Sequence, residues 1–125
     1  MQYPKAQQPF HCVHIDIEDI PTQQDGTVYV FFCVDEFSTM ALGTEVKKTT
    51  TPDDYIDVIN KCVIKHPKRH IHQTETILFL DIDKKHEKYL SEKLPGIKTF
   101  FFDRNKTLLH TLPLRISFYK GGAAK

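Results

Sequence analysis

Two aspartates lie where buried strands would carry them to one place. Asp16 sits within an alternating apolar and polar run, between Ile15 and Ile17, and Asp81 directly follows an apolar run over residues 76–80. If these two strands are neighbours, the two carboxylates converge near one spot. Magnesium and manganese prefer such oxygen ligands, and in nucleases two ions of this kind clamp the attacking and leaving oxygens of a phosphoryl transfer. Asp16 and Asp81 are therefore predicted to be catalytic, metal-binding residues.

The residues that follow Asp81 allow other roles as well. Asp81-Ile82-Asp83 precedes a predicted helix, and an aspartate in that position often forms a turn or caps the helix. Asp83 is the candidate cap, and it is also a weaker candidate for a third metal ligand. The metal-binding role of Asp81 depends on its strand lying beside the strand of Asp16.

Basic side chains follow the first predicted helix and begin the second. Lys84, Lys85 and Lys88 begin the second helix, close to Asp81, whereas Lys68 and Arg69 lie in a histidine-rich loop. Lysine and arginine at these positions would neutralise DNA phosphates and make binding salt-dependent. The alternative is that they form ordinary solvated surface, as charged helix faces and loops usually do. The histidines of the loop match no zinc-site spacing well.

The composition is that of an ordinary globular domain. The 125 residues are 40% hydrophobic and 26% charged, and 17 Lys and Arg against 16 Asp and Glu leave a net charge of +1. This balance argues against a protein that coats nucleic acid through a strongly basic face, but it allows a local basic strip beside an acidic site. No apolar run approaches the roughly 18 residues that span a membrane, and no secretory signal is expected. The three scattered cysteines are predicted to be buried, reduced thiols, so we expect a cytoplasmic protein with no membrane partner.

Hydrophobic periodicity predicts five strands and two helices. The strands are expected over residues 10–17, 27–34, 39–47, 76–80 and 97–102, and the helices over residues 52–65 and 83–94. Thr51 is the predicted cap of the first helix, with Pro52 at its first position, and Gly43 marks a bulge or a close approach in the third strand. An extended arm is expected over residues 1–9, one domain over residues 10–119 and a flexible tail over residues 120–125.

The order of these elements is β-β-β-α-β-α-β. Three strands with short connections predict an antiparallel meander, and the later alternation of strands and helices predicts right-handed parallel crossovers. The expected fold is therefore an α/β domain with a mixed five-stranded sheet flanked by helices. Ribonuclease-H-like domains share this order.

Two segments resemble the catalytic core of retroviral-type integrases and insertion-sequence transposases, the DDE family of the ribonuclease-H-like superfamily. The first is VHIDI at residues 13–17 with GTVYVFFCVDEFS at residues 26–38, which is similar to the family's first catalytic strand and its hairpin. The second is KTTTPDDYIDVI at residues 48–59, which resembles the helix that follows. The resemblance covers roughly residues 10–100.

This resemblance implies a role for three acids. Asp16 matches the first metal-binding acid of the family, and Asp81 matches the second. Asp35 matches a structural position in the hairpin turn. The resemblance also implies DNA integration or recombination, DNA as partner, magnesium or manganese as cofactor when the site is active, and a homodimer formed through helix faces.

The chain also departs from the family pattern. Ile82 and Asp83 stand where members have Asn-Gly after the second acid, and no acid follows Asp103, although members place a catalytic Glu on a later helix. We therefore expect a truncated or degenerate core with reduced or absent activity. Two alternatives remain open. One is a non-catalytic dimerisation or interaction module. The other is a DEDD-type 3′–5′ exonuclease, because Asp16-Ile17-Glu18 resembles the first motif of that family. Alternation along the strand would place Asp16 and Glu18 on one face.

Overall fold

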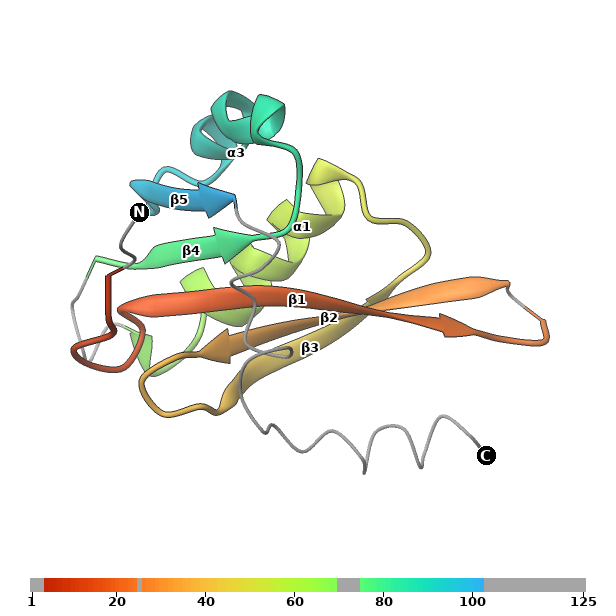
Figure 1. The fold of residues 1–125 in the computed structure, drawn as a ribbon, viewed down its shortest axis with the longest axis horizontal. Coiled ribbons are helices and arrows are strands. Elements are labelled where there is room, and N and C mark those ends of the chain that lie inside the picture. The colour runs from red at the N-terminus through yellow and green to blue at the C-terminus, as the bar shows by residue number, and fades with distance from the viewer. Residues whose placement is uncertain (1–3, 25, 70–74, 103–125) are drawn as a thin grey trace.

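The computed structural model describes residues 4–24, 26–69 and 75–102 (Figure 1). The elements in chain order are β1 (Cys12–Pro21), β2 (Thr27–Asp35), β3 (Ala41–Lys47), α1 (Pro52–Ile59), the π-helical turn η1 (Asn60–Ile64), β4 (Ile77–Leu80), the 3-10 turn η2 (Lys84–His86), α3 (Glu87–Lys93) and β5 (Thr99–Phe102). The predicted order of strands and helices is confirmed. The predicted tail and the end of the predicted domain lie outside the described residues. No described helix is long and apolar enough to cross a membrane.

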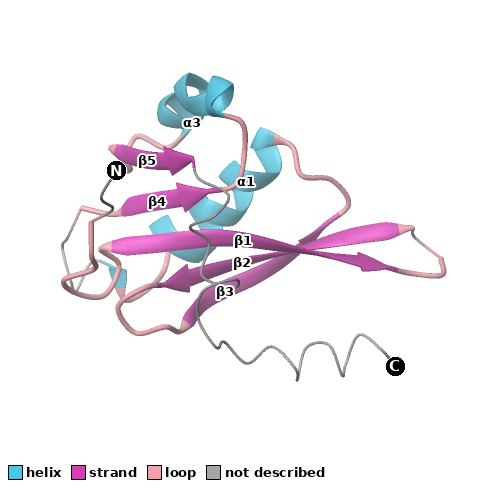
Figure 2. Cartoon of the chain, in the orientation of Figure 1, coloured by secondary structure: helices cyan, strands magenta, loops and turns pink. Residues whose placement is uncertain are grey.

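The five strands form one mixed sheet in the order β3-β2-β1-β4-β5 (Figure 2). β1 pairs with β2, and β2 with β3, in antiparallel fashion. β1 pairs with β4, and β4 with β5, in parallel fashion. The meander and the parallel crossovers predicted from connection lengths are therefore both present, and β1 and β4 are neighbours.

β1 differs from its predicted range of residues 10–17 at both ends, because it begins at Cys12 and continues to Pro21. Its last pair with β4 is Ile15↔Leu80, whereas its pairing with β2 continues to Pro21↔Thr27. β1 and β2 therefore extend past β4 as a two-stranded ribbon. In β1 the side chains from Ile17 to Pro21 are only half-buried or exposed, which explains why hydrophobic alternation does not reveal this extension.

The first helix begins as its sequence predicts. The Thr51 side chain accepts a hydrogen bond from Asp54 N, the Asp54 side chain accepts one from Thr51 N, and Pro52 stands at the first position. This capping box satisfies amide groups that a helix start leaves without intrahelical partners. Although burial opposes the shift, hydrogen bonds from Thr49 and Thr51 hold the pKa of Asp54 below its ordinary value. The helix then continues into the wider turn η1, whose apolar spacing alone does not distinguish it from an α-helix.

Both helices pack on the same face of the sheet. Val13 and Ile15 of β1, Tyr55 of α1 and Leu90 of α3 belong to one buried cluster. Because side chains alternate along a strand, Asp16 projects from the opposite face. The core that holds the helices therefore also determines the direction of the candidate site residue.

Gly43 combines the bulge and the close approach predicted for it. The pairing of β2 with β3 shifts register next to the Cys33↔Gly43 pair, and a Cβ atom on Gly43 would lie 2.6 Å from Cys62 Sγ. The hydrogen bond between the Cys33 and Cys62 thiols, together with burial, raises the pKa of Cys33. Both residues, like Cys12, are buried free cysteines, as predicted.

Candidate functional site

Asp16 and Asp81 follow the last residue pair between β1 and β4. Ile15 pairs with Leu80 in parallel register, and Asp16 and Asp81 are the next residue of each strand. Neighbouring strands lie about 4.8 Å apart, and side chains at one level of a parallel pair project from the same face. The sheet therefore brings together the two predicted acids, on the face opposite α1 and α3.

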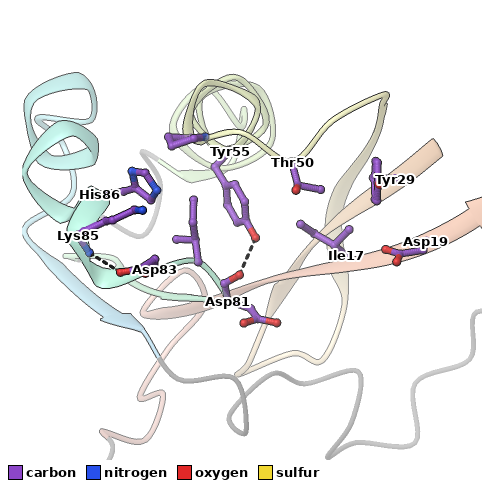
Figure 3. A pocket seen from close by; sticks show the side chains of 11 residues that line it. Ile17, Asp19, Tyr29, Thr50, Tyr55, Asp81, Asp83, Lys85 and His86 are labelled. Carbon is purple, nitrogen blue, oxygen red and sulfur yellow. Dashed lines mark hydrogen bonds between the residues drawn. The ribbon is translucent and has the colours of Figure 1, made fainter. Parts of the chain in front are cut away.

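The two carboxylates differ in their exposure. Asp16 is 3% exposed, whereas Asp81 is exposed at the carboxyl end of β4. The Tyr55 hydroxyl donates a hydrogen bond of 3.0 Å to the Asp81 carbonyl oxygen, which ties the end of β4 to α1. Figure 3 shows that the Asp81 carboxylate points away from this tyrosine. One acid is thus held within the sheet and the other faces solvent at its edge.

A polar cavity of about 460 Å³ opens beside Asp81, on the side of α1 (Figure 3). Its lining comes from four segments of the chain, namely the β1–β2 ribbon, the start of α1, the end of β4 and the turn η2. Among the lining residues, Asp19 and Tyr29 lie opposite each other on the ribbon. Asp19 was not among the predicted site residues, because the strand was predicted to end at Ile17 and residues 18–20 show no regular alternation.

Asp83 and the neighbouring lysines lie next to Asp81. Asp83 caps η2, since its Oδ1 accepts a hydrogen bond of 2.9 Å from Lys85 N. Its predicted capping role is therefore confirmed, and its role as a third metal ligand stays a prediction. Asp83 and Lys85 line the cavity described above, and Lys84 lines a second, smaller one that Asp81 also borders. Lys88 is exposed on α3 and borders neither cavity.

Lys68 and Arg69 lie elsewhere. Arg69 donates hydrogen bonds to Thr76 Oγ1 and to the Gly96 carbonyl oxygen, each 3.4 Å long. Thr76 precedes β4, whereas Asp81 follows it. These two basic residues are thus at the opposite end of β4 from the acids. They do not lie beside Lys84 and Lys85, so the two sets of basic residues do not form one local patch. Two of the three histidines of the loop lie outside the described residues.

Asp35 has the structural role that the hairpin pattern implies. Its Oδ1 accepts a hydrogen bond of 3.0 Å from Phe10 N, and its Oδ2 accepts bonds from Ser38 N at 3.2 Å and Ser38 Oγ at 2.7 Å. The residue is 1% exposed. A carboxylate with this many donors closes the β2–β3 turn and anchors the approach to β1.

The catalytic domain of Mos1 mariner transposase is similar to this arrangement. Two solved structures of that domain, one of them with raltegravir and manganese, match 92% of the chain with TM-scores of 0.59 and 0.58. The chain has the fold of a transposase catalytic domain. The ribonuclease-H-like fold predicted from the integrase-like segments is therefore confirmed.

The likeness to these transposase domains is one of fold alone. Sequence identity is 15% and 16%, and the chain spans 60% of the length of each matched domain. No family model and no curated protein sequence matches the chain. The chemistry of the site must therefore be argued from this chain's own residues.

The carboxylates that follow the last β1–β4 pair suit a hard divalent cation. Both Asp16 and Asp81 offer carboxylate oxygens, and their places in the register put them on one face. Magnesium is commonly held in this way, by one or two carboxylates with waters and substrate phosphates. Among residues 4–24, 26–69 and 75–102, no group of three or more His, Cys, Asp or Glu is placed to hold a metal ion. Asp16 and Asp81 therefore stay a predicted pair of metal ligands.

Proposed function

We propose that this chain is the core of a DNA-transposing or DNA-integrating protein in which Asp16 and Asp81 hold a divalent cation, magnesium or manganese. The observation that carries the proposal is the position of these two acids, one residue beyond the last β1–β4 pair. The fold of a transposase catalytic domain supports it. DNA is the proposed partner and phosphoryl transfer the proposed chemistry.

Each residue of the proposed site has a distinct task. Asp16 is 3% exposed and its backbone pairs with Phe32 of β2, which together fix the direction of its carboxylate. The bond from Tyr55 to the Asp81 backbone sets the end of β4. A bound divalent cation would supply Lewis-acid stabilisation of the charge that develops on phosphate oxygens. Lys84 and Lys85, exposed beside Asp81, would bind the neighbouring phosphates of the DNA.

Two carboxylates predict a slow reaction. A donor removed from a site that stabilises developing charge typically lowers the rate by about 100- to 1,000-fold. We therefore propose that DNA and metal binding are retained and that strand cleavage is slow compared with a three-acid site. Asp83 is the proposed source of a third carboxylate, since it is exposed two residues after Asp81.

The test is a DNA-nicking and strand-transfer assay on the full chain, with Mg²⁺ or Mn²⁺ and with chelator. We expect metal-dependent nicking that Asp16→Asn and Asp81→Asn each abolish. Asp19→Asn is the matched control, because Asp19 borders the cavity from the face opposite Asp16 and should leave nicking unchanged. Nicking that persists in both site variants, or without metal, would contradict the proposal. Circular dichroism of each variant verifies that it is folded.

The same assay separates the two alternatives. Digestion from 3′ ends that is lost in Glu18→Gln as well as Asp16→Asn would indicate an exonuclease, since Glu18 and Asp16 share a face of β1. A chain that neither nicks DNA nor binds it would indicate an interaction module. If Lys84 and Lys85 contact DNA, replacing both with Ala reduces the slope of log affinity against log salt by about 0.7–0.9 for each lysine.

A further inference from the structure

The outer edge of β3 is a strand edge without a partner among the described residues. β3 is the first strand of the sheet order and pairs only with β2. Val46 is 60% exposed on this strand, and Thr44 and Lys48 are exposed as well. An exposed edge presents backbone N–H and C=O groups that can pair with another strand. The edge at the other end of the sheet, β5, has only four residues and its side chains are half-buried or exposed.

The charges of β3 do not protect this edge from pairing, because they already have partners on the helix side. The Lys47 ammonium is paired with Asp57, and Glu45 Oε1 lies 3.5 Å from Lys61 Nζ, which also lies 3.1 Å from Asp57 Oδ2. These four side chains carry equal numbers of positive and negative charges. The network leaves Val46, which projects from the opposite face, as an exposed apolar side chain of the strand.

We propose that β3 pairs with β3 of a second copy of this chain, antiparallel, about a twofold axis through Val46. This inference does not depend on the proposed DNA chemistry. In that register Val46 faces the same residue of the partner copy, and Glu45 faces Lys47 in both directions. Opposite charges and β-branched pairs directly across an antiparallel ladder each stabilise it. The two sheets then form one continuous sheet with an isologous interface.

Neighbouring registers are excluded by the same residues. An axis through Glu45 places two glutamates directly opposite each other, and an axis through Lys47 places two lysines opposite each other, which is destabilising. An axis through Thr44 brings Val46 against Leu42, where the register of β3 is already irregular at the bulge. The regular part of the strand, residues 44–47, therefore favours one register only.

The test combines crosslinking with sedimentation of the full chain. In the proposed register the Cα atoms of two opposed residues lie about 4.5–5.5 Å apart, which suits a disulfide. Val46→Cys should therefore form a covalent dimer under mild oxidation at least ten times faster than Thr44→Cys. Thr44 is the matched control, because it is exposed on the same face, yet its two copies would be offset by four residues, about 13 Å. The native cysteines are buried.

Sedimentation of the unmodified chain should show a weak monomer–dimer equilibrium, since a single strand pair is small for an interface. Val46→Lys should raise the dimer dissociation constant at least tenfold, because it opposes two charges at the axis. Equal crosslinking rates for the two cysteine variants together with a strict monomer would overturn the proposal. A faster reaction of Thr44→Cys would overturn the register, and a dimer that Val46→Lys leaves unchanged would assign dimerisation to another surface.

Discussion

The stretch in which β1 pairs with β4 has a closed end, near Asp35, and an open end, near Asp81. At the closed end, around Asp35, protein donors fill the acceptor sites: Asp35 accepts three hydrogen bonds, and Glu36 accepts from His14 Nε2 at 2.8 Å and from Ala6 N at 3.0 Å. At the open end, Asp81 is exposed and borders two cavities. The same residue type is thus used for architecture at one end and left accessible to ligands at the other.

This contrast distinguishes two acids whose local sequences are similar. Asp35 and Asp81 each follow a strongly apolar strand, and each is adjacent to a turn. They differ in what the turn does next. The β2–β3 turn folds back so that Ser38 reaches the carboxylate of Asp35, and Phe10 N reaches it from the segment before β1. The chain after Asp81 leads away into η2 instead.

The largest expected effect is on stability, and it compares the two ends directly. Asp35→Ala leaves the buried Phe10 amide, and the amide and hydroxyl of Ser38, without their acceptor, so it should lower the free energy of unfolding by about 3 kcal/mol or more. Asp81→Ala, at an exposed position, should lower it by about 1 kcal/mol or less. Urea denaturation of both variants measures the difference. Equal losses of unfolding free energy would show that Asp35 is no more important for stability than Asp81.

A second, smaller effect on stability compares a crowded glycine with an uncrowded one. Gly43→Ala places a Cβ 2.6 Å from Cys62 Sγ, and such overpacking should cost about 1–3 kcal/mol of unfolding free energy. Gly96→Ala is the control, because no atom lies within 4 Å of its added Cβ. Thermal denaturation of each variant, and of Gly43→Ala combined with Cys62→Ala, measures the cost. Cys62→Ala removes the contact with Sγ and leaves the Cys62 Cβ at 2.9 Å, so it should recover part of the loss. No recovery would refute the contact with Sγ as its main cause.

The smallest expected effect concerns a surface acid whose partners are lysines. Hydrogen bonds from Lys47 and then Lys61 lower the pKa of Asp57. A lowered folded-state pKa stabilises the protein above the unfolded pKa of about 3.9, and that stabilisation is lost as the pH falls through the folded value. Because the pair is partly exposed, the contribution should be below about 1 kcal/mol.

The measurement is the stability difference between the wild type and Asp57→Asn as a function of pH. The wild type should be more stable by a constant amount above about pH 5, and the difference should shrink toward zero in more acidic solution. Higher salt should reduce it at neutral pH. A difference that grows as the pH falls would contradict the assignment of this pair.

Much of the fold could be predicted because its signals are local. Thr51 and Pro52 mark the start of α1 before any packing is known, and connection lengths distinguish the antiparallel strands from the parallel ones. The extension of β1 past Ile17 could not be predicted in the same way, since it lies in a half-exposed ribbon stabilised by pairing with β2. The π-helical turn η1 also has no local signature distinct from that of an α-helix.

The candidate site was predictable in part for the same reason. The convergence of Asp16 and Asp81 follows from two apolar strands, which the sequence indicates, and from the parallel pairing of β1 with β4, which the structure shows. The positions of Lys68 and Arg69 follow from where the crossover enters β4, at the end away from Asp81. The contribution of Asp19 to the cavity depends on the length of the ribbon and therefore required the structure.

Binding of Mn²⁺ observed by nuclear magnetic resonance tests the central claim most directly. The paramagnetic ion should broaden the amide signals of Asp16 and Asp81 first, while those of Asp35, at the closed end, persist. Asp16→Asn or Asp81→Asn should abolish the selective broadening, and Asp19→Asn should leave it intact. Broadening centred on Asp19, or unchanged by both site substitutions, would contradict the account of Asp16 and Asp81 as a metal-binding pair.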